Sequence, residues 1–196
     1  MKKLFRWGIV VTVALILGAA GVALRWYTDN RMPMFRSEVQ LYVFPDMPAS
    51  DVLSVLERSA RKPSSVRRAF KSKRVAEYIQ PGHYTVLPSN SSVYVARMLN
   101  NGWQSPVNVS LSGNLRLKGG IASKISSQLL VDSASVRAAL DDDALLSRYG
   151  YSSSDVFALL IPATYEMYWT ASVEEFLDRQ KAANDAFWHL DFRERR

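Results

Sequence analysis

No cysteine occurs among the 196 residues of this chain. Its absence excludes a disulfide framework, a thiolate nucleophile and a cysteine-ligated metal site. Histidine is nearly as rare: His83 and His189 lie 106 residues apart, and no carboxylates accompany them at the spacing of a metal site. We therefore interpret both histidines as structural, and we expect neither a bound metal nor a cofactor.

Two further sequence patterns could indicate a phosphate-binding loop and a cation site, but both signals are weak. Gly113 and the Lys-Gly-Gly run at 118–120 lack the order of residues found in a phosphate-binding loop. The acidic run Asp141 to Asp143 has the oxygen ligands that a hard cation prefers, but three consecutive residues cannot converge from one helical face. We expect a solvated loop there.

One long apolar run is present, over the 17 residues 8–24, and its only polar side-chain atom is the Thr12 hydroxyl. A helix rises ~1.5 Å per residue, so about 17 to 20 residues can just cross a hydrocarbon core of ~30 Å. Trp7 precedes the run and Arg25-Trp26-Tyr27 follows it, and such rings favour the membrane–water boundary. The segment 1–27 is therefore expected to be a cytoplasmic tip and transmembrane anchor.

The residues before the run set the expected orientation. Lys2, Lys3 and Arg6 favour a cytoplasmic amino end, which places the bulk of the chain on the extracytoplasmic side of the membrane. A cleaved signal peptide is the alternative, because small residues occur at 18–23. The run is longer than the ~7–15 residues of a signal core and has an anchoring outer end, so we favour the uncleaved anchor.

Charge divides the chain into two parts. Residues 1–135 carry 18 Lys and Arg against 7 Asp and Glu, whereas residues 136–196 carry 7 against 11, which suggests two modules. The basic excess peaks between Arg58 and Arg74. A solvated helical face or attraction to anionic headgroups or an acidic wall polymer can explain it. Nucleic acid is not expected, because the segment is placed outside the membrane and its one aromatic residue is Phe70.

Patterning and turn residues predict the first elements after a polar linker at 28–37. Strands are expected at 39–44 and 83–87, each closed by a proline. Between them we expect a helix capped by Ser50, a second helix capped by Ser64 or Ser65, and a short apolar turn at 75–79. Ser91 or Ser92 caps the following helix, which ends at Asn101-Gly102.

The remaining residues continue as a mixture of strand and helix. A strand at 105–111 is followed by helices at about 117–130 and at 134–147, the latter capped by Ser133. Ser172 caps a long helix, which reaches Arg196 without a closing Gly, Asn or Pro. We expect the chain to stop partway through a domain, with nothing to pack against the apolar side of this helix.

This order of parts resembles the endolytic murein transglycosylases of the bacterial inner membrane, the YceG-like family. The resemblance rests on the single anchor, the strand-helix-helix-strand block with its Gly82-His83-Tyr84 signature, the helix ending at Asn101-Gly102 with its following strand, and Pro162-Ala163-Thr164-Tyr165 followed by Glu166. It implies an α+β fold: one transmembrane helix, a LysM-like subdomain with its following helix at 38–103, and the first part of a transglycosylase domain at 104–196. Ala163 departs from the acidic or amide residue that the family often has there.

The resemblance also implies a function. The expected activity is cleavage of nascent peptidoglycan glycan strands to 1,6-anhydro ends during wall synthesis, with wall-synthesis enzymes as candidate partners. The family's catalytic glutamate lies in an Ala-Ser-Ile-x-Glu-x-Glu helix, which is expected downstream of Arg196, so this chain has no catalytic residue of its own and should be inactive alone. A non-catalytic module that binds peptidoglycan or a wall synthase is the alternative.

Pro162, Thr164, Tyr165 and Glu166 are the candidate residues of a substrate groove. Lytic transglycosylases use one glutamate as acid and base, and such a glutamate needs an apolar, partly buried setting. Glu166 is the local candidate, but a groove-lining or purely structural role is the more expected one. Tyr84, Tyr94 and Trp103 can stack on sugar rings, although packing in a core is the default for all three.

Overall fold

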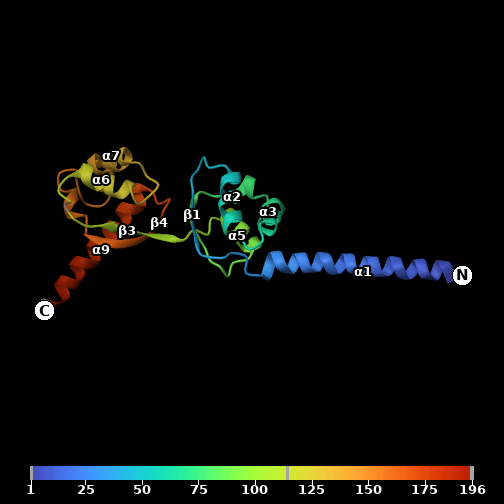
Figure 1. The fold of residues 1–196 in the computed structure, drawn as a ribbon. Helices are drawn as coiled ribbons and strands as arrows, with labels where there is room; N and C mark the ends of the chain where they lie inside the picture. Colours follow the sequence, from blue (N-terminus) through green and yellow to red (C-terminus); the bar gives the residue numbers. More distant parts are fainter. Residues whose placement is uncertain (1, 114, 195–196) are drawn as a thin grey trace. The chain divides into compact units, whose positions relative to one another are not determined.

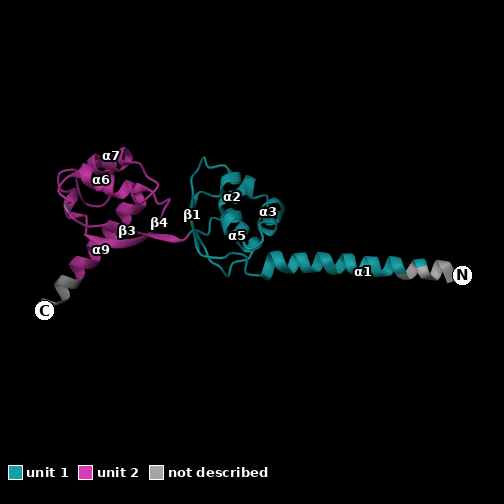
Figure 2. Ribbon diagram, in the orientation of Figure 1, with its two compact units in different colours: residues 1–104 teal, residues 105–196 magenta. Residues whose placement is uncertain are grey.

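A computed structural model describes residues 2–113 and 115–194 of the chain (Figure 1). The chain divides into two compact units, Met1–Gln104 and Ser105–Arg196, shown in different colours in Figure 2. Helices and two small sheets make an α+β protein, as the sequence predicts. Each unit has a hydrophobic core of its own.

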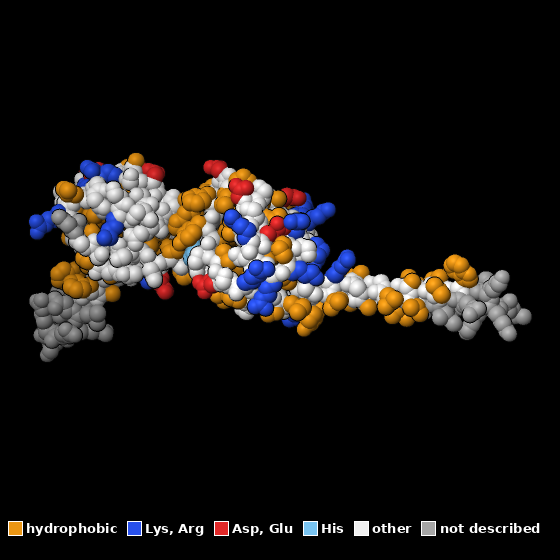
Figure 3. All heavy atoms as spheres, viewed as in Figure 1, with side chains coloured by type: hydrophobic (Ala, Val, Ile, Leu, Met, Phe, Trp, Pro, Cys, Tyr) orange, Lys and Arg blue, Asp and Glu red, His pale blue; other side chains and the backbone are white. Residues whose placement is uncertain are grey.

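Unit 1 begins with α1 (Lys2–Arg31), the one helix of the described chain that is long and apolar enough to cross a membrane. Its candidate span, Val10–Arg31, has 22 residues, which at ~1.5 Å each reach ~33 Å. Hydrophobic side chains are exposed along it (Figure 3), among them Leu15, Leu17 and Trp26. The exposed apolar part of this helix is long enough for the hydrocarbon core of a bilayer.

The rest of unit 1 follows the predicted strand-helix-helix-strand order. Strand β1 (Val39–Val43) pairs antiparallel with β2 (Gly82–Val86) in one two-stranded sheet. Helices α2 (Ala49–Ser59), α3 (Pro63–Ser72) and the short α4 (Val75–Tyr78) lie between the strands in sequence, and α5 (Ser92–Asn100) follows. Gly102, after the end of α5, has a φ of 63°, the left-handed conformation that glycine adopts without strain.

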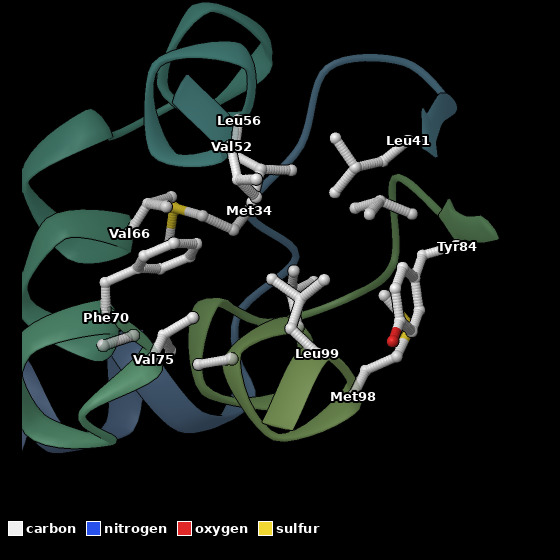
Figure 4. Packing of buried hydrophobic residues seen from close by; sticks show 14 of the residues in the cluster. Met34, Leu41, Val52, Leu56, Val66, Phe70, Val75, Tyr84, Met98 and Leu99 are labelled. Atoms are coloured by element: carbon white, nitrogen blue, oxygen red, sulfur yellow. The ribbon is translucent and has the colours of Figure 1, made fainter. Parts of the chain in front are cut away.

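Apolar side chains at helical and alternating spacing form the core of unit 1. Val52 and Leu56 lie one turn apart on α2, Val66 and Phe70 lie one turn apart on α3, and all four are buried (Figure 4). The sheet contributes alternate residues, including Leu41 and Tyr84. Neither α2 nor α3 could bury its apolar face without the other elements, so the unit folds as a whole.

Two predicted helix caps in unit 1 are wrong. The N-cap of α2 is Pro48, and Ser50 lies inside the first turn. Helix α3 begins at Pro63 with Lys62 as its N-cap, because proline at the first position lacks only an N–H that the helix leaves unpaired. Ser65 is buried instead, and its hydroxyl bonds to that of Ser92 at 2.9 Å. The predicted cap of α5 is confirmed: the Ser91 side chain accepts from the amide of Tyr94.

The prediction of a polar linker at 28–37 is also wrong. Helix α1 continues to Arg31, and Asp29 near its end accepts hydrogen bonds from Arg68 and Ser65 of α3. The next residues, Met34 and Phe35, are almost fully buried in the core of unit 1. Residues 28–37 are thus an integral part of unit 1. The contacts of Asp29 attach the end of α1 directly to α3.

The described part of unit 2 contains one two-stranded antiparallel sheet and five helical segments. Strands β3 (Pro106–Leu111) and β4 (Ala163–Tyr168) pair antiparallel, although 51 residues separate them in sequence. The intervening elements are α6 (Lys118–Ser126), α7 (Ser133–Asp141), α8 (Asp143–Ser147) and the 3₁₀ turn η1 (Val156–Ala158). Helix α9 (Val173–Glu194) follows β4.

Several expectations for unit 2 need correction. Helix α6 ends at Ser126 rather than near 130, and the N-cap of α7 is Asp132 rather than Ser133. The acidic run is not a loop: Asp141 ends α7, Asp142 caps α8 by accepting from two backbone amides, and Asp143 begins α8. Because each carboxylate already has a separate local role, the run does not converge on one point.

The expectation that α9 lacks a packing partner is wrong for its first half. Phe176 and Leu177 are fully buried in the core of unit 2. Ser172 caps the helix as predicted, and its own amide donates to Glu175 at 2.7 Å, which makes a reciprocal capping box. Farther along, Phe187 and Trp188 are about half exposed.

Candidate functional site

The alternation of β4 decides where the predicted groove residues point. Thr164, Glu166 and Tyr168 are exposed, whereas Tyr165 and Met167 are buried. Side chains alternate between the two faces of a strand, so Thr164 and Glu166 share one face and Tyr165 lies on the other. The structure therefore brings together two of the four predicted residues, with exposed Pro162 just before the strand.

The neighbouring strand extends this exposed face. Ser110 of β3 is directly opposite Thr164, and Asn108 is opposite Glu166. Hydroxyl, amide and carboxylate groups thus occupy adjacent positions on the outer face of the sheet. Such groups can both donate and accept hydrogen bonds with the hydroxyl groups of a sugar.

A groove runs between the end of β4 and the first half of α9. It has a volume of about 450 Å³ and is lined by Glu166, Met167, Tyr168, Ala171, Glu175, Asp178, Arg179 and Ala182. The four α9 residues among these have i, i+3, i+4 and i+7 spacing, which places them on one helical face. The groove therefore offers an exposed aromatic ring, three carboxylates and one guanidinium.

Buried polar side chains of α9 hydrogen-bond to the backbone of residues 158–161, which lead into β4. The Gln180 side-chain oxygen accepts from the amide of Ile161 at 3.0 Å, and the Asn184 amide donates to the carbonyl of Ala158 at 2.7 Å. The Tyr165 hydroxyl donates to the carbonyl of Ile161 at 2.6 Å, and burial raises the pKa of this phenol. Tyr165 therefore positions the strand from the core side and does not line the groove.

Two of the groove carboxylates already have partners in the protein. Glu175 accepts the amide of Ser172 in the capping box, and Asp178 accepts the Tyr149 hydroxyl at 2.9 Å. Burial, together with the neighbouring Asp178 carboxylate, raises the pKa of Tyr149 to about 12. The Glu166 side chain, in contrast, has no hydrogen bond or ion pair to another described residue. Its exposed side chain is available to a ligand.

The setting of Glu166 does not suit a proton donor. A glycosidic acid that stays protonated near neutral pH needs an apolar, partly buried site. Glu166 is exposed on the outer face of β4, opposite Asn108. Its position fits hydrogen bonding to a substrate better than protonation of a leaving oxygen.

The aromatic residues of unit 1 divide into two groups. Tyr84 is fully buried, its hydroxyl donates to the carbonyl of Gln80 at 2.8 Å, and burial raises its pKa to about 12. Tyr94 and Trp103 are 45% and 47% exposed, and their ring centroids are 5.9 Å apart. Core packing explains Tyr84, whereas the Tyr94–Trp103 pair forms an exposed aromatic platform.

The histidines have separate surroundings. His83 is buried beside Tyr42, and its Nε2 atom is 2.7 Å from the side-chain oxygen of Gln40. His189 is exposed on α9. Within the described ranges, no three His, Asp or Glu side chains are grouped so that they could hold a metal ion.

Sequence reasoning missed the α9 side of the groove, including Asp178 and Arg179. These residues lie more than ten positions from the Pro-x-Thr-Tyr motif, so only the packing of α9 against β4 brings them near Glu166. The orientation of Tyr165, however, follows from the period of two in the segment 163–168, which is a strand signal.

No family model matches the chain, and no curated protein matches it. A comparison with solved structures finds a crystal structure of a yceG-like protein from Listeria monocytogenes, with 19% sequence identity and a TM-score of 0.39. The match covers 77% of this chain and 55% of that protein, so the chain spans about half the length of the solved structure. That protein carries the name of the family which the sequence motifs resemble.

Proposed function

We propose that this protein is the membrane-anchored, glycan-contacting part of an endolytic murein transglycosylase. The observation that carries the proposal is the placement of the family-like motif: Thr164, Glu166 and Tyr168 share the exposed face of β4 beside a groove. An exposed aromatic ring next to hydrogen-bonding groups suits a sugar chain, which presents apolar ring faces and hydroxyl edges.

The anchor supports a role close to the membrane. In the proposed topology the amino end is cytoplasmic, α1 crosses the inner membrane once, and both units lie outside. Helix α1 is continuous through the small residues at 18–23 and enters unit 1 directly, which favours an anchor that stays on the mature protein. Unit 1 is then held near the site where new glycan strands leave the membrane.

In the proposed division of labour, unit 1 is the LysM-like subdomain and the groove of unit 2 positions the glycan. The Tyr94–Trp103 platform of unit 1 provides a second surface for stacking on sugar rings. The acid that protonates the glycosidic oxygen is a glutamate outside these 196 residues, because Glu166 is too exposed for that role. Cleavage then gives a 1,6-anhydro end when the sugar's own 6-hydroxyl attacks the anomeric carbon.

Glycan binding tests the groove. The full chain is purified in detergent and titrated with uncrosslinked glycan strands, and bound protein is measured by co-sedimentation. We expect Tyr168→Ala and Glu166→Gln each to weaken binding roughly fivefold, which corresponds to a loss of about 1 kcal/mol. The matched controls, Tyr78→Ala in unit 1 and Glu174→Gln on α9, should bind as the unsubstituted chain does. Equal effects of test and control substitutions would refute the groove assignment.

Product analysis tests the assignment of the acid. The chain should bind glycan strands but release no anhydro-muropeptides from them. If it releases them and Glu166→Gln abolishes the release, Glu166 is the acid and the proposal of an external glutamate is wrong. Reading the coding sequence beyond Arg196 for an Ala-Ser-Ile-x-Glu-x-Glu segment gives an independent check.

A binding module without cleavage is the second candidate function. The exposure of Glu166 favours it, since the described residues then contact glycan or a wall synthase but do not supply a proton. Glycan binding without any catalytic segment in the natural chain would support this alternative.

A further inference from the structure

A second groove lies in unit 1, where the end of α1 meets α3 and α5. Its volume is about 750 Å³, and its lining includes Trp26, Asp29, Arg68, Lys71, Lys73 and Arg97. Figure 3 shows the blue Lys and Arg side chains gathered around this junction. The groove is separate from the site on β4, and neither the fold nor the proposed glycan binding accounts for its basic character.

The charges of the groove do not cancel. The Asp29 carboxylate is occupied by Arg68, with nitrogen–oxygen distances of 2.9 and 2.7 Å, and by the Ser65 hydroxyl. The side chains of Lys71, Lys73 and Arg97 have no carboxylate partner among the residues that the structure describes. Three unpaired positive charges around one concave site attract an anion.

The position of the groove along α1 indicates which anion can reach it. This step rests on α1 spanning a membrane, as proposed above. Asp29 is five residues beyond Leu24, the last residue of the apolar run, which corresponds to ~7.5 Å along the helix axis. The headgroup region on each side of a bilayer is roughly 5–7 Å thick. Asp29 therefore lies at the outer edge of the headgroup region, and its contacts with α3 hold the basic groove beside the headgroups.

We propose that this groove binds the phosphate headgroup of an anionic phospholipid, with Lys71, Lys73 and Arg97 as the phosphate-binding cations. Trp26 lies at the membrane boundary, where an indole ring can contact the glycerol and upper acyl region of the same lipid. Val93 and Ala69 add apolar surface to the lining. A soluble acidic wall polymer has no acyl chain for Trp26 and these side chains to contact at the membrane boundary, so a lipid fits the mixed lining better.

Native mass spectrometry of the full chain tests the proposal without any glycan present. The protein in detergent receives equal amounts of phosphatidylglycerol and phosphatidylcholine, and the retained lipids are counted. The unsubstituted chain should retain phosphatidylglycerol preferentially. Each cation removed should lower the enrichment roughly fivefold, so Lys71→Gln/Lys73→Gln should lower it about 25-fold and Arg97→Gln about fivefold.

Two control variants separate specific binding from net charge. Arg36→Gln/Arg58→Gln removes two exposed charges of unit 1 outside the groove and should leave the enrichment unchanged. Lys71→Arg/Lys73→Arg keeps the charge and should retain it. Circular dichroism melting checks that all variants are folded. Equal losses in the groove and control variants, or no preference for phosphatidylglycerol in the unsubstituted chain, would overturn the proposal.

A competition arm decides between lipid and polymer. Soluble polyglycerol phosphate, at the same phosphate concentration, should not displace bound phosphatidylglycerol. Displacement would show that the groove takes a wall polymer and would refute the lipid assignment. The same spectra give the mass of the chain, so loss of the anchor by cleavage would be recognised separately, and the glycan-binding variants at Glu166 and Tyr168 test the proposed function independently.

Discussion

We call the contacts of Asp29 on α1 with Arg68 and Ser65 on α3 the α1–α3 clamp. A single isosteric change, Asp29→Asn, should break this clamp. The carboxylate accepts two hydrogen bonds from Arg68, at 2.9 and 2.7 Å, and one from Ser65. The asparagine side chain has one acceptor oxygen and no charge, so it can keep at most part of this arrangement. Ser65 retains its bond to Ser92, whereas Arg68 loses its counter-charge.

The expected loss of stability follows from the exposure of the partners. Hydrogen bonds to a charged group contribute about 1.5–3 kcal/mol when buried. The Asp29 side chain is 14% exposed and that of Arg68 is 38% exposed, so solvent screening places the estimate for the pair near 2 kcal/mol. This corresponds to roughly a 30-fold change in the unfolding equilibrium of unit 1.

Hydrogen exchange of peptides from the full chain in detergent measures the effect separately for each unit. In Asp29→Asn, the slowest amides of α3 and α5 should exchange roughly 30-fold faster, while those of β3 and β4 in unit 2 keep their rates. Glu57→Gln is the matched control, because Glu57 also forms a two-bond pair, with Arg67, at 2.9 and 3.0 Å. The Arg67 side chain is 66% exposed, so this change should have little effect. If both variants behave alike, the clamp does not stabilise unit 1 and our reasoning about burial is wrong.

Three further predictions concern the cores. Leu56→Ala, at a fully buried position of α2, should destabilise unit 1 by about 2–5 kcal/mol in urea unfolding, whereas exposed Ser54→Ala should leave the midpoint unchanged. Burial raises the pKa of Tyr84 to about 12, above the ~10 of an exposed phenol. The stabilisation of unit 1 by the neutral phenol is therefore complete below pH 10 and is lost as the pH rises toward 12. Melting temperatures should fall over this window, and they should fall less in Tyr84→Phe. Gln180→Ala leaves the amide of Ile161 without its acceptor and should cost unit 2 about 1–3 kcal/mol, measured by hydrogen exchange of β4. The control is Lys181→Ala, one position along, where the partly exposed side chain pairs with Asp185; it should not change that exchange.

Local signals were sufficient for most elements of the fold. Prolines and glycines mark the ends of β1 and β2, and the apolar spacing of Val52 and Leu56 indicates a helix that needs a partner. The caps at Ser91 and Ser172 follow from the same rules, because a serine before an apolar helical pattern has few competing roles. The failures at Ser50 and Ser65 show the limit of such rules where a proline or a buried hydrogen bond competes.

Long-range contacts explain the expectations that failed. The segment 28–37 is polar enough to suggest a linker, but Asp29 forms an ion pair with Arg68, which lies 39 residues later in the sequence. Met34 and Phe35 pack in a core with residues from the sheet and from α2 to α5. Similarly, the sequence of α9 shows no packing partner, whereas in the structure Phe176 and Leu177 lie in the core of unit 2. Of the candidate site, the sequence motif located Thr164 and Glu166, whereas the α9 wall of the groove required tertiary structure.

The joint between α1 and α3 also bears on the order in which the protein is made. In the proposed topology α1 crosses the membrane, and it leaves the ribosome before α3 and α5. A helix in a bilayer satisfies its own backbone hydrogen bonds, so α1 can form before these two helices are made. Asp29, Met34 and Phe35 are then already held at the membrane surface when α3 and α5 emerge. With one end of the chain fixed in this way, the nascent unit has fewer conformations to lose as it folds. In the proposed topology, α1 thus provides the fixed end on which the first unit assembles, in addition to retaining the finished protein.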